Sequence, residues 1–113
     1  MSIVQKEFKK AVNEQWKEKP PLERYQKKLI ADLVVLEAEK EKAIDFPQYE
    51  KLNDEKNLYS IRHPEAKKNV RVIYTIFNKS LIILLTAFLE NNKSDYKNAI
   101  KVAKTRLKNL EKN

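Results

Sequence analysis

Glycine and cysteine are both absent from the 113 residues of this chain, and histidine occurs once. The lack of glycine argues against phosphate-binding loops and dinucleotide-binding turns, because these depend on backbone conformations and close approaches that glycine allows. The lack of cysteine argues against a disulfide framework and against thiolate metal sites. With one histidine and no convincing pair of carboxylates, no zinc or magnesium centre is expected either. We therefore expect no cofactor and a metal-free action.

Long apolar runs are also missing. The longest apolar stretch, Val72 to Leu89, is interrupted by Tyr74 and by polar residues 78–80, which predicts a β-hairpin and not a membrane span. The amino terminus lacks the apolar core of a secretion signal. We expect a cytoplasmic protein with no membrane partner, and a length of 113 residues fits one domain over residues 1–113.

The positive charge is confined to the second half of the chain. Residues 1–57 hold 12 Lys/Arg and 12 Asp/Glu, whereas residues 58–113 hold 12 Lys/Arg and only 4 Asp/Glu, which accounts for the whole net charge of +8. Such one-sided charge is typical of proteins that bind RNA, DNA or an acidic protein. A solvated lysine-rich surface gives the same count. The charge alone leaves both interpretations open.

Two helices are predicted in the first half. Residues 4–16 and 22–36 place apolar side chains at intervals of three and four, the spacing of one helix face. Pro20 and Pro21 separate the two segments, because proline lacks the amide donor that a helix interior needs. Residues 46–57 contain a proline and a polar run, and we expect an irregular connection there.

The second half predicts a small antiparallel sheet and a closing helix. β-branched and aromatic residues gather in three short runs, which polar turns separate: 58–62, 70–77 and 81–88. We expect Ser94 to cap a final helix whose apolar stripe includes Ala99 and Ala103. The predicted fold class is α+β: an N-terminal helical hairpin packed on a small antiparallel sheet of three to four strands, with a C-terminal helix.

Cations and aromatic residues gather on and beside the predicted strands. RNA cleavage through the 2′-hydroxyl needs a proton acceptor, a proton donor and cations that stabilise charge on the phosphoryl group, but no metal. Arginine suits the last role because its planar fork contacts phosphate oxygens bidentately, so we predict that Arg62 and Arg71 bind phosphate. His63, Lys93 and Tyr96 are the candidates for proton transfer.

Each of these candidates also has a purely structural interpretation. Arg62 and Arg71 are able to pair with surface carboxylates, and His63 to be solvated in its polar turn. Tyr96 lies on the apolar stripe of the last helix, where packing is its ordinary role, and Lys93 is able to be a plain surface residue. RNA-backbone contacts are predicted for six further lysines: Lys67, Lys68, Lys97, Lys101, Lys104 and Lys108.

The carboxy-terminal half carries a spaced pattern of residues. It consists of a leucine-tyrosine-x-x-arginine strand, an arginine-x-x-tyrosine strand, a strand that ends in phenylalanine, and a helix with spaced alanines and an arginine: Leu58 to Arg62, Arg71 to Tyr74, Ile82 to Phe88, and Ala99, Ala103 and Arg106. In order and spacing this pattern resembles the HigB-like, phage-derived branch of the RelE/ParE superfamily of toxin–antitoxin toxins. The resemblance covers about residues 50–110.

The resemblance implies a ribosome-associated mRNA endonuclease that inhibits translation and is held inactive by an antitoxin, which wraps or occludes the basic face. It places Arg62 and Arg71 on functional arginine positions of the family. Two departures matter. Residues 90–92 stand where many HigB-like proteins carry paired lysines, with only Lys93 retained, and the usual first strand is absent or reduced to Ser2 to Val4.

Three functions remain open from the sequence. The first is the mRNA endonuclease, an enzyme that acts on ribosome-bound message. The second is a ParE-like toxin that binds DNA gyrase on the same scaffold without cleaving RNA. The third is a catalytically silent binding module, which the loss of the paired lysines favours. Supercoiling and message-cleavage assays distinguish them.

Overall fold

The computed structural model describes residues 2–15, 22–53, 55–62 and 69–112. Within these ranges the elements are three α-helices, one short 3-10 helix and four strands. In chain order they are α1 Ile3–Gln15, α2 Leu22–Glu39, η1 Lys40–Asp45, β1 Tyr49–Lys51, β2 Tyr59–Arg62, β3 Asn69–Phe77, β4 Leu81–Glu90 and α3 Lys93–Glu111. The predicted α+β fold class is confirmed, with an antiparallel sheet of four strands. Pro20 and Pro21 lie outside the described residues.

The four strands form one antiparallel sheet in the order β1-β2-β3-β4, so each strand pairs with its neighbour along the chain. The β3–β4 hairpin turns at Asn78 and Lys79, whose φ angles of 52° and 67° are left-handed. Tight hairpins favour such angles because their twist matches that of the strands, and asparagine tolerates them better than most residues. A register shift between Ile73 and Tyr74 marks a bulge in the same hairpin.

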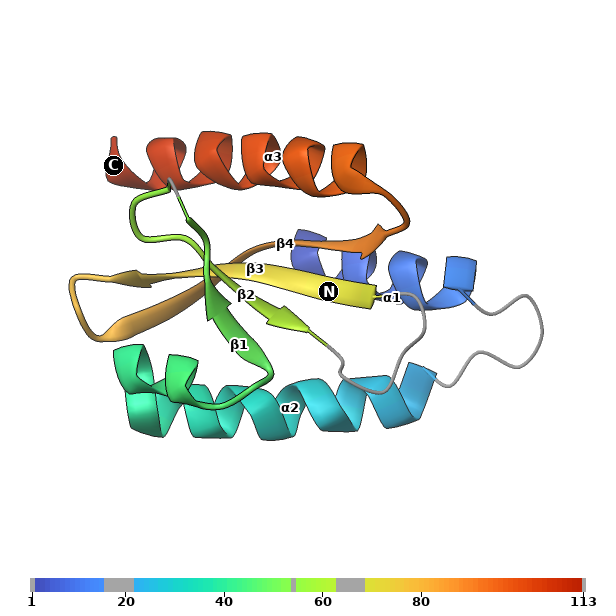
Figure 1. The fold of residues 1–113 in the computed structure, drawn as a ribbon, viewed down its shortest axis with the longest axis horizontal. Coiled ribbons are helices and arrows are strands. Elements are labelled where there is room, and N and C mark those ends of the chain that lie inside the picture. The colour runs from blue at the N-terminus through green and yellow to red at the C-terminus, as the bar shows by residue number, and fades with distance from the viewer. Residues whose placement is uncertain (1, 16–21, 54, 63–68, 113) are drawn as a thin grey trace.

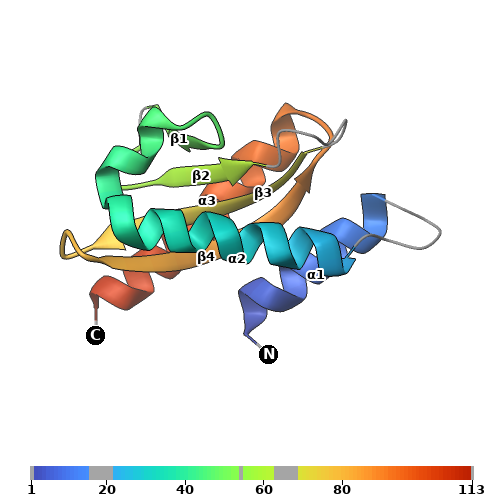
Figure 2. The same cartoon turned by 90° about the horizontal axis from the view of Figure 1, so that it is seen from below.

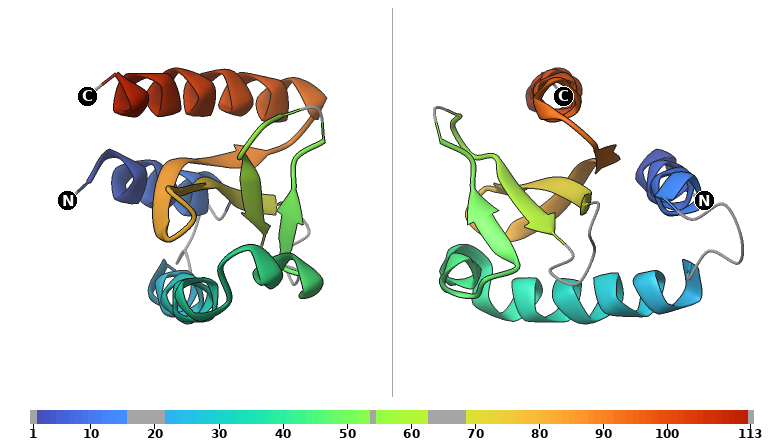
Figure 3. Two further views of the ribbon diagram at one scale, coloured as in Figure 1. Left: turned by 90° about the vertical axis from the view of Figure 1, so that its left-hand side faces the viewer. Right: turned by 45° about the vertical axis from the view of Figure 1, so that its right-hand side comes forward.

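Helices cover both faces of the sheet (Figure 1). α3 lies on one face, where Ala99 and Ala103 are buried against Leu58, Ile73 and Leu85. α2 crosses the opposite face, as Figure 2 shows, and α1 lies beside β4 between the two other helices (Figure 3). Burial on both faces explains why β3 and β4 are apolar at nearly every position. None of the described helices is long and apolar enough to cross a membrane.

Two local expectations were wrong. Residues 49–51, within the predicted irregular connection, form the edge strand β1, whose register places Glu50 opposite Ser60. The N-cap of α3 is Asn92 and not Ser94, because Asn92 and Asp95 exchange side-chain and backbone hydrogen bonds in a capping box. Residues 3 and 4 begin α1, so of the two alternatives for the usual first strand, a short strand at Ser2 to Val4 is not the one observed.

Candidate functional site

Arg71 lies near the start of β3 on the sheet face that α3 covers, and its side chain is only 9% exposed. Its Nε is 2.8 Å from Glu90 Oε1, and its Nη1 is 3.1 Å from Glu50 Oε1. Glu50 comes from the edge strand β1 and Glu90 from the end of β4, so Arg71 joins the two sides of the sheet. A buried guanidinium needs such partners, since an unpaired buried charge is strongly unfavourable.

Tyr96 closes this cluster from α3. Its ring lies 5.1 Å from the Arg71 guanidinium carbon and packs edge-on against Phe88, with 5.5 Å between the ring centroids. Its hydroxyl donates a hydrogen bond of 3.0 Å to Glu50 Oε1. Burial raises the pKa of Tyr96 to about 12, so its hydroxyl keeps its proton at neutral pH. A neutral phenol is able to donate a hydrogen bond or a proton, but it does not act as a base.

β2 supplies the two remaining polar side chains of this region. Ser60 is fully buried opposite Glu50, and its hydroxyl has no hydrogen-bond partner within the described residues. Arg62 lies opposite Arg71 in the register of β2 and β3, at the margin of the cluster. Its Nε donates a hydrogen bond of 3.2 Å to the Pro47 carbonyl. Each of the four strands thus contributes a polar side chain on one face.

We define the charged cluster as Glu50, Arg71, Glu90 and Tyr96. Of the five residues predicted for phosphate binding and proton transfer, the structure brings Arg71 and Tyr96 together and places Arg62 beside them. Lys93, at the start of α3, is exposed. His63 lies outside the described residues, as do Lys67 and Lys68.

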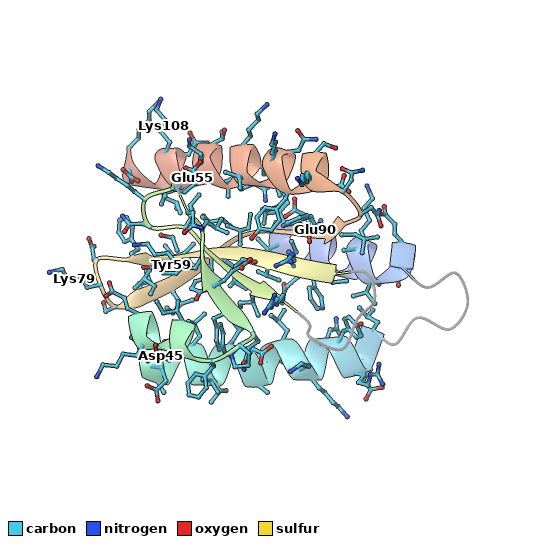
Figure 4. All side chains as sticks on the ribbon, viewed as in Figure 1. Asp45, Glu55, Tyr59, Lys79, Glu90 and Lys108 are labelled. Atoms are coloured by element: carbon cyan, nitrogen blue, oxygen red, sulfur yellow. The ribbon has the colours of Figure 1, made fainter. Side chains whose placement is uncertain are left out.

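Four of the predicted RNA-binding lysines form a row along α3, at positions three or four residues apart and all exposed: Lys97, Lys101, Lys104 and Lys108. Residues at this spacing share one helix face. Lys104 lies 3.3 Å from Glu55 of the β1–β2 connection. Figure 4 shows Lys108 and Glu55 at one end of α3, whereas Glu90 lies below the other end. We refer to these four residues as the lysine row.

Glu50 and Glu90 are the members of the charged cluster that sequence reasoning missed. Glu50 was placed in an irregular connection, and Glu90 was noted only as a departure from paired lysines. The available signal was Arg71 itself, since an arginine within an apolar strand needs a nearby carboxylate. Neither the strand β1 nor its register was evident from the sequence, because the strand has only three residues.

The charged cluster combines two carboxylates, a phenol and a guanidinium, and Glu50, Tyr96 and Arg71 each supply a different kind of group. Glu50 is the most open member, with its side chain 42% exposed. A carboxylate accepts a proton, a protonated phenol donates one, and a guanidinium stabilises negative charge, so the three groups supply the elements of general acid–base catalysis. Among the described residues, no group of three or more His, Cys, Asp or Glu is arranged to hold a metal ion.

Residues 14–108 match the family model described as phage derived protein Gp49-like (DUF891). The chain belongs to this family. The matched segment includes the whole charged cluster and the lysine row. Gp49-like proteins are a family of RelE/HigB-like toxins, and a toxin of this kind implies an antitoxin partner. The chain matches no curated protein and no solved structure.

Proposed function

We propose that this Gp49-like protein is the toxin of a toxin–antitoxin pair and cleaves ribosome-bound mRNA without a metal ion, in the cytoplasm. The observation that carries the proposal is the contact of one carboxylate with both a guanidinium and a phenol: Glu50 Oε1 lies 3.1 Å from Arg71 Nη1 and 3.0 Å from the Tyr96 hydroxyl. These groups match the chemistry of 2′-hydroxyl attack, and the family match agrees with a toxin.

In the proposed reaction Glu50 accepts the proton of the 2′-hydroxyl. The 2′-oxygen then attacks the adjacent phosphorus, which forms a 2′,3′-cyclic phosphate and breaks the bond to the 5′-oxygen of the next nucleotide. Tyr96 donates its proton to that leaving oxygen. Protonation of Glu50 also removes a negative charge beside Arg71, so the guanidinium becomes available to the phosphoryl oxygens as they gain charge.

The lysine row supplies the contacts that bring RNA to this site. Its side chains are exposed on the helix from which Tyr96 reaches the charged cluster. Lysines in such a row neutralise successive phosphates and release counterions, without selecting a base sequence. Arg62 lies at the margin of the cluster, where it is placed to contact a phosphate that flanks the cleaved bond.

A second candidate function is the catalytically silent binding module. The observation that favours it is the burial of Arg71, whose guanidinium is held by two carboxylates and covered by Tyr96. An arginine in this state also serves simply as a buried ion pair. In this module the fold and the lysine row would bind a partner without cleaving RNA.

Growth arrest and primer extension on a translated reporter message test the proposal. Cells are induced for the wild-type chain, for Glu50→Gln and for Arg71→Lys. We expect the wild type to arrest growth and cut the message, and both variants to lose about 100-fold or more of the cleavage, comparable to the loss of one transition-state donor. Growth arrest with intact message and inhibited supercoiling would indicate a gyrase toxin, and normal growth would indicate the silent module.

A further inference from the structure

β4 is an outer strand of the sheet, and side chains from two helices satisfy part of its open edge. The Ala87 amide donates a hydrogen bond of 3.3 Å to Glu7 Oε1 of α1. The Leu85 carbonyl accepts a hydrogen bond of 2.7 Å from Arg106 Nη1 of α3. Glu7 and Arg106 also pair with each other at 2.8 Å. This Glu7–Arg106 bridge occupies the place of a neighbouring strand at residues 85–87, and it protects that part of the edge from pairing.

The next edge position along β4 is Leu89. Residues of an antiparallel strand alternate, so that every second residue turns both its N–H and its C=O to the same side. The Ala87 amide points away from β3, because it reaches Glu7. Leu89, two residues further along the same regular stretch of the ladder, therefore turns its N–H and C=O to the same open side. The bridge does not reach this position.

A groove of about 320 Å³ opens along this edge. It is lined by residues 86–89 of β4, by Ala11 and Glu14 of α1, and by Asn98 and Val102 of α3. In the right-hand view of Figure 3, the end of β4 lies between α3 and α1. The small side chain of Ala11 leaves room beside the strand. The groove thus presents strand backbone between two helices.

We propose that an extended segment of the antitoxin lies in this groove and pairs with the backbone of Leu89 as an added strand. Backbone pairing with an open sheet edge is an established mode of peptide recognition. The existence of the groove is independent of the function proposed above, but the identity of the partner rests on that function. The segment contacts Val102, which is 38% exposed, through an apolar side chain.

The charges in the groove favour a peptide over RNA. Three carboxylates line it, those of Glu7, Glu14 and Asp95. The one lining cation, Lys10, lies 3.9 Å from Glu14, so the carboxylates outnumber the cations and the groove disfavours a phosphate backbone. Asn98 and Val102 follow Lys97 and Lys101 by one position, which turns them about 100° around the helix axis. The antitoxin segment and the lysine row therefore occupy different sides of α3. Docking at the groove leaves the lysine row open to RNA.

Paired variants of Leu89 test the docking of the partner. The probe is the protein encoded by the neighbouring open reading frame, titrated calorimetrically against the purified full chain. Leu89→Pro removes the N–H that faces the groove, a change that an edge strand tolerates, whereas Leu89→Ala shortens the side chain and keeps the N–H. We expect Leu89→Pro to weaken binding roughly tenfold relative to Leu89→Ala, as for one lost backbone hydrogen bond.

A second pair of variants acts at the surface of α3 and keeps the sheet intact. Val102→Arg places a long side chain in the groove, and we expect it to weaken binding by roughly tenfold or more, because it blocks the added strand. Thr105→Arg adds the same charge to an exposed position that does not line the groove, and we expect binding close to wild type. Hydrogen exchange of the complex should show protection of the Leu89 amide.

The outcomes separate docking from toxicity. Equal affinity of Leu89→Pro and Leu89→Ala together with unaffected binding of Val102→Arg would overturn the docking site, as would the absence of any binding by the probe. Protection confined to the lysine row would overturn it as well and would support an antitoxin that covers the basic face. Growth arrest by the chain alone tests the toxin function without any reference to the groove.

Discussion

Buried polar groups have different partners on the two faces of the sheet. On the α3 face, Arg71 binds two carboxylates at hydrogen-bond distance. On the α2 face, Asp32 is the only buried carboxylate among the described residues, and Lys28 Nζ lies 3.8 Å from its Oδ1. One Asp32 oxygen accepts a bond of 3.5 Å from Gln48, and within the described residues the other has no hydrogen-bond partner.

The α2 face also carries three buried tyrosines. Tyr59 and Tyr74 stack with 5.2 Å between their centroids, and Tyr49 donates a hydrogen bond of 2.5 Å to the Asp32 carbonyl. Burial raises the pKa of Asp32 and of these three tyrosines, which favours their neutral forms. The α2 face therefore tends toward neutral polar groups, whereas the α3 face holds a guanidinium between carboxylates. Only the second arrangement is suited to chemistry on an anion.

The largest expected effect is on the α3 face. Arg71→Ala should lower the free energy of unfolding by about 1.5 to 3 kcal/mol, because the half-buried Glu90 and the more open Glu50 lose the cation that binds them both. Urea unfolding measures the loss. Arg24→Ala is the matched control, since Arg24 is exposed and lies 6.0 Å from the centre of the Tyr25 ring. Equal losses in both variants would mean that the Arg71 contacts contribute no stability.

On the α2 face, removal of the hydroxyl from two different tyrosines should change the free energy of unfolding in different ways. Tyr49→Phe leaves the Asp32 carbonyl without its donor and should cost about 1 kcal/mol or more of unfolding free energy. Tyr74→Phe removes a buried hydroxyl that has no hydrogen-bond partner within the described residues, so it should be neutral or stabilising. Thermal and urea unfolding of the pair decide. A loss in Tyr74→Phe equal to that in Tyr49→Phe would show that both hydroxyls are bonded in solution.

The elements that the sequence predicted well are those with a long apolar period. α1, α2 and α3 run for 13, 18 and 19 residues, and β3 and β4 for nine and ten, so each shows its pattern over several turns or pairs. β1 has three residues, which is too short for an alternation to be seen. Its position is set by its pairing with β2, and this tertiary contact leaves no local pattern in the sequence.

The site shows the same division. Arg71 could be singled out from the sequence because it interrupts an apolar strand. Tyr96 could be singled out because it lies on the apolar stripe of the last helix. Glu50 could not, since its role depends on the register that places it opposite Ser60. Asn92 was missed as the cap of α3 because Ser94 is also a good cap residue, and the decision rests on the bonds that Asp95 returns to the turn.

A smaller effect concerns pH. The raised pKa of Asp32 means that the folded state holds this proton more tightly than the unfolded chain, so Asp32 makes stability fall as pH rises from the ordinary value of 3.8 through the raised value. Asp32→Asn cannot titrate. We expect the variant to match the wild type below that window and to exceed its stability above it, in unfolding measured from pH 3 to 8. A variant less stable than wild type at neutral pH would show that Lys28 compensates the charge fully.

The smallest effect tests whether the lysine row, on the outer surface of α3, binds RNA independently of the face beneath it. Lys101→Ala should reduce the salt slope of single-stranded RNA binding by about 0.7, the value for one phosphate contact. Lys104→Ala should have less effect, because Glu55 at 3.3 Å already pairs with that side chain. Fluorescence anisotropy over a salt series measures both slopes, with Lys79→Ala in the β3–β4 turn as the control. Identical slopes for all three variants would separate the lysine row from RNA binding and leave the charged cluster as the only basis for an RNA substrate.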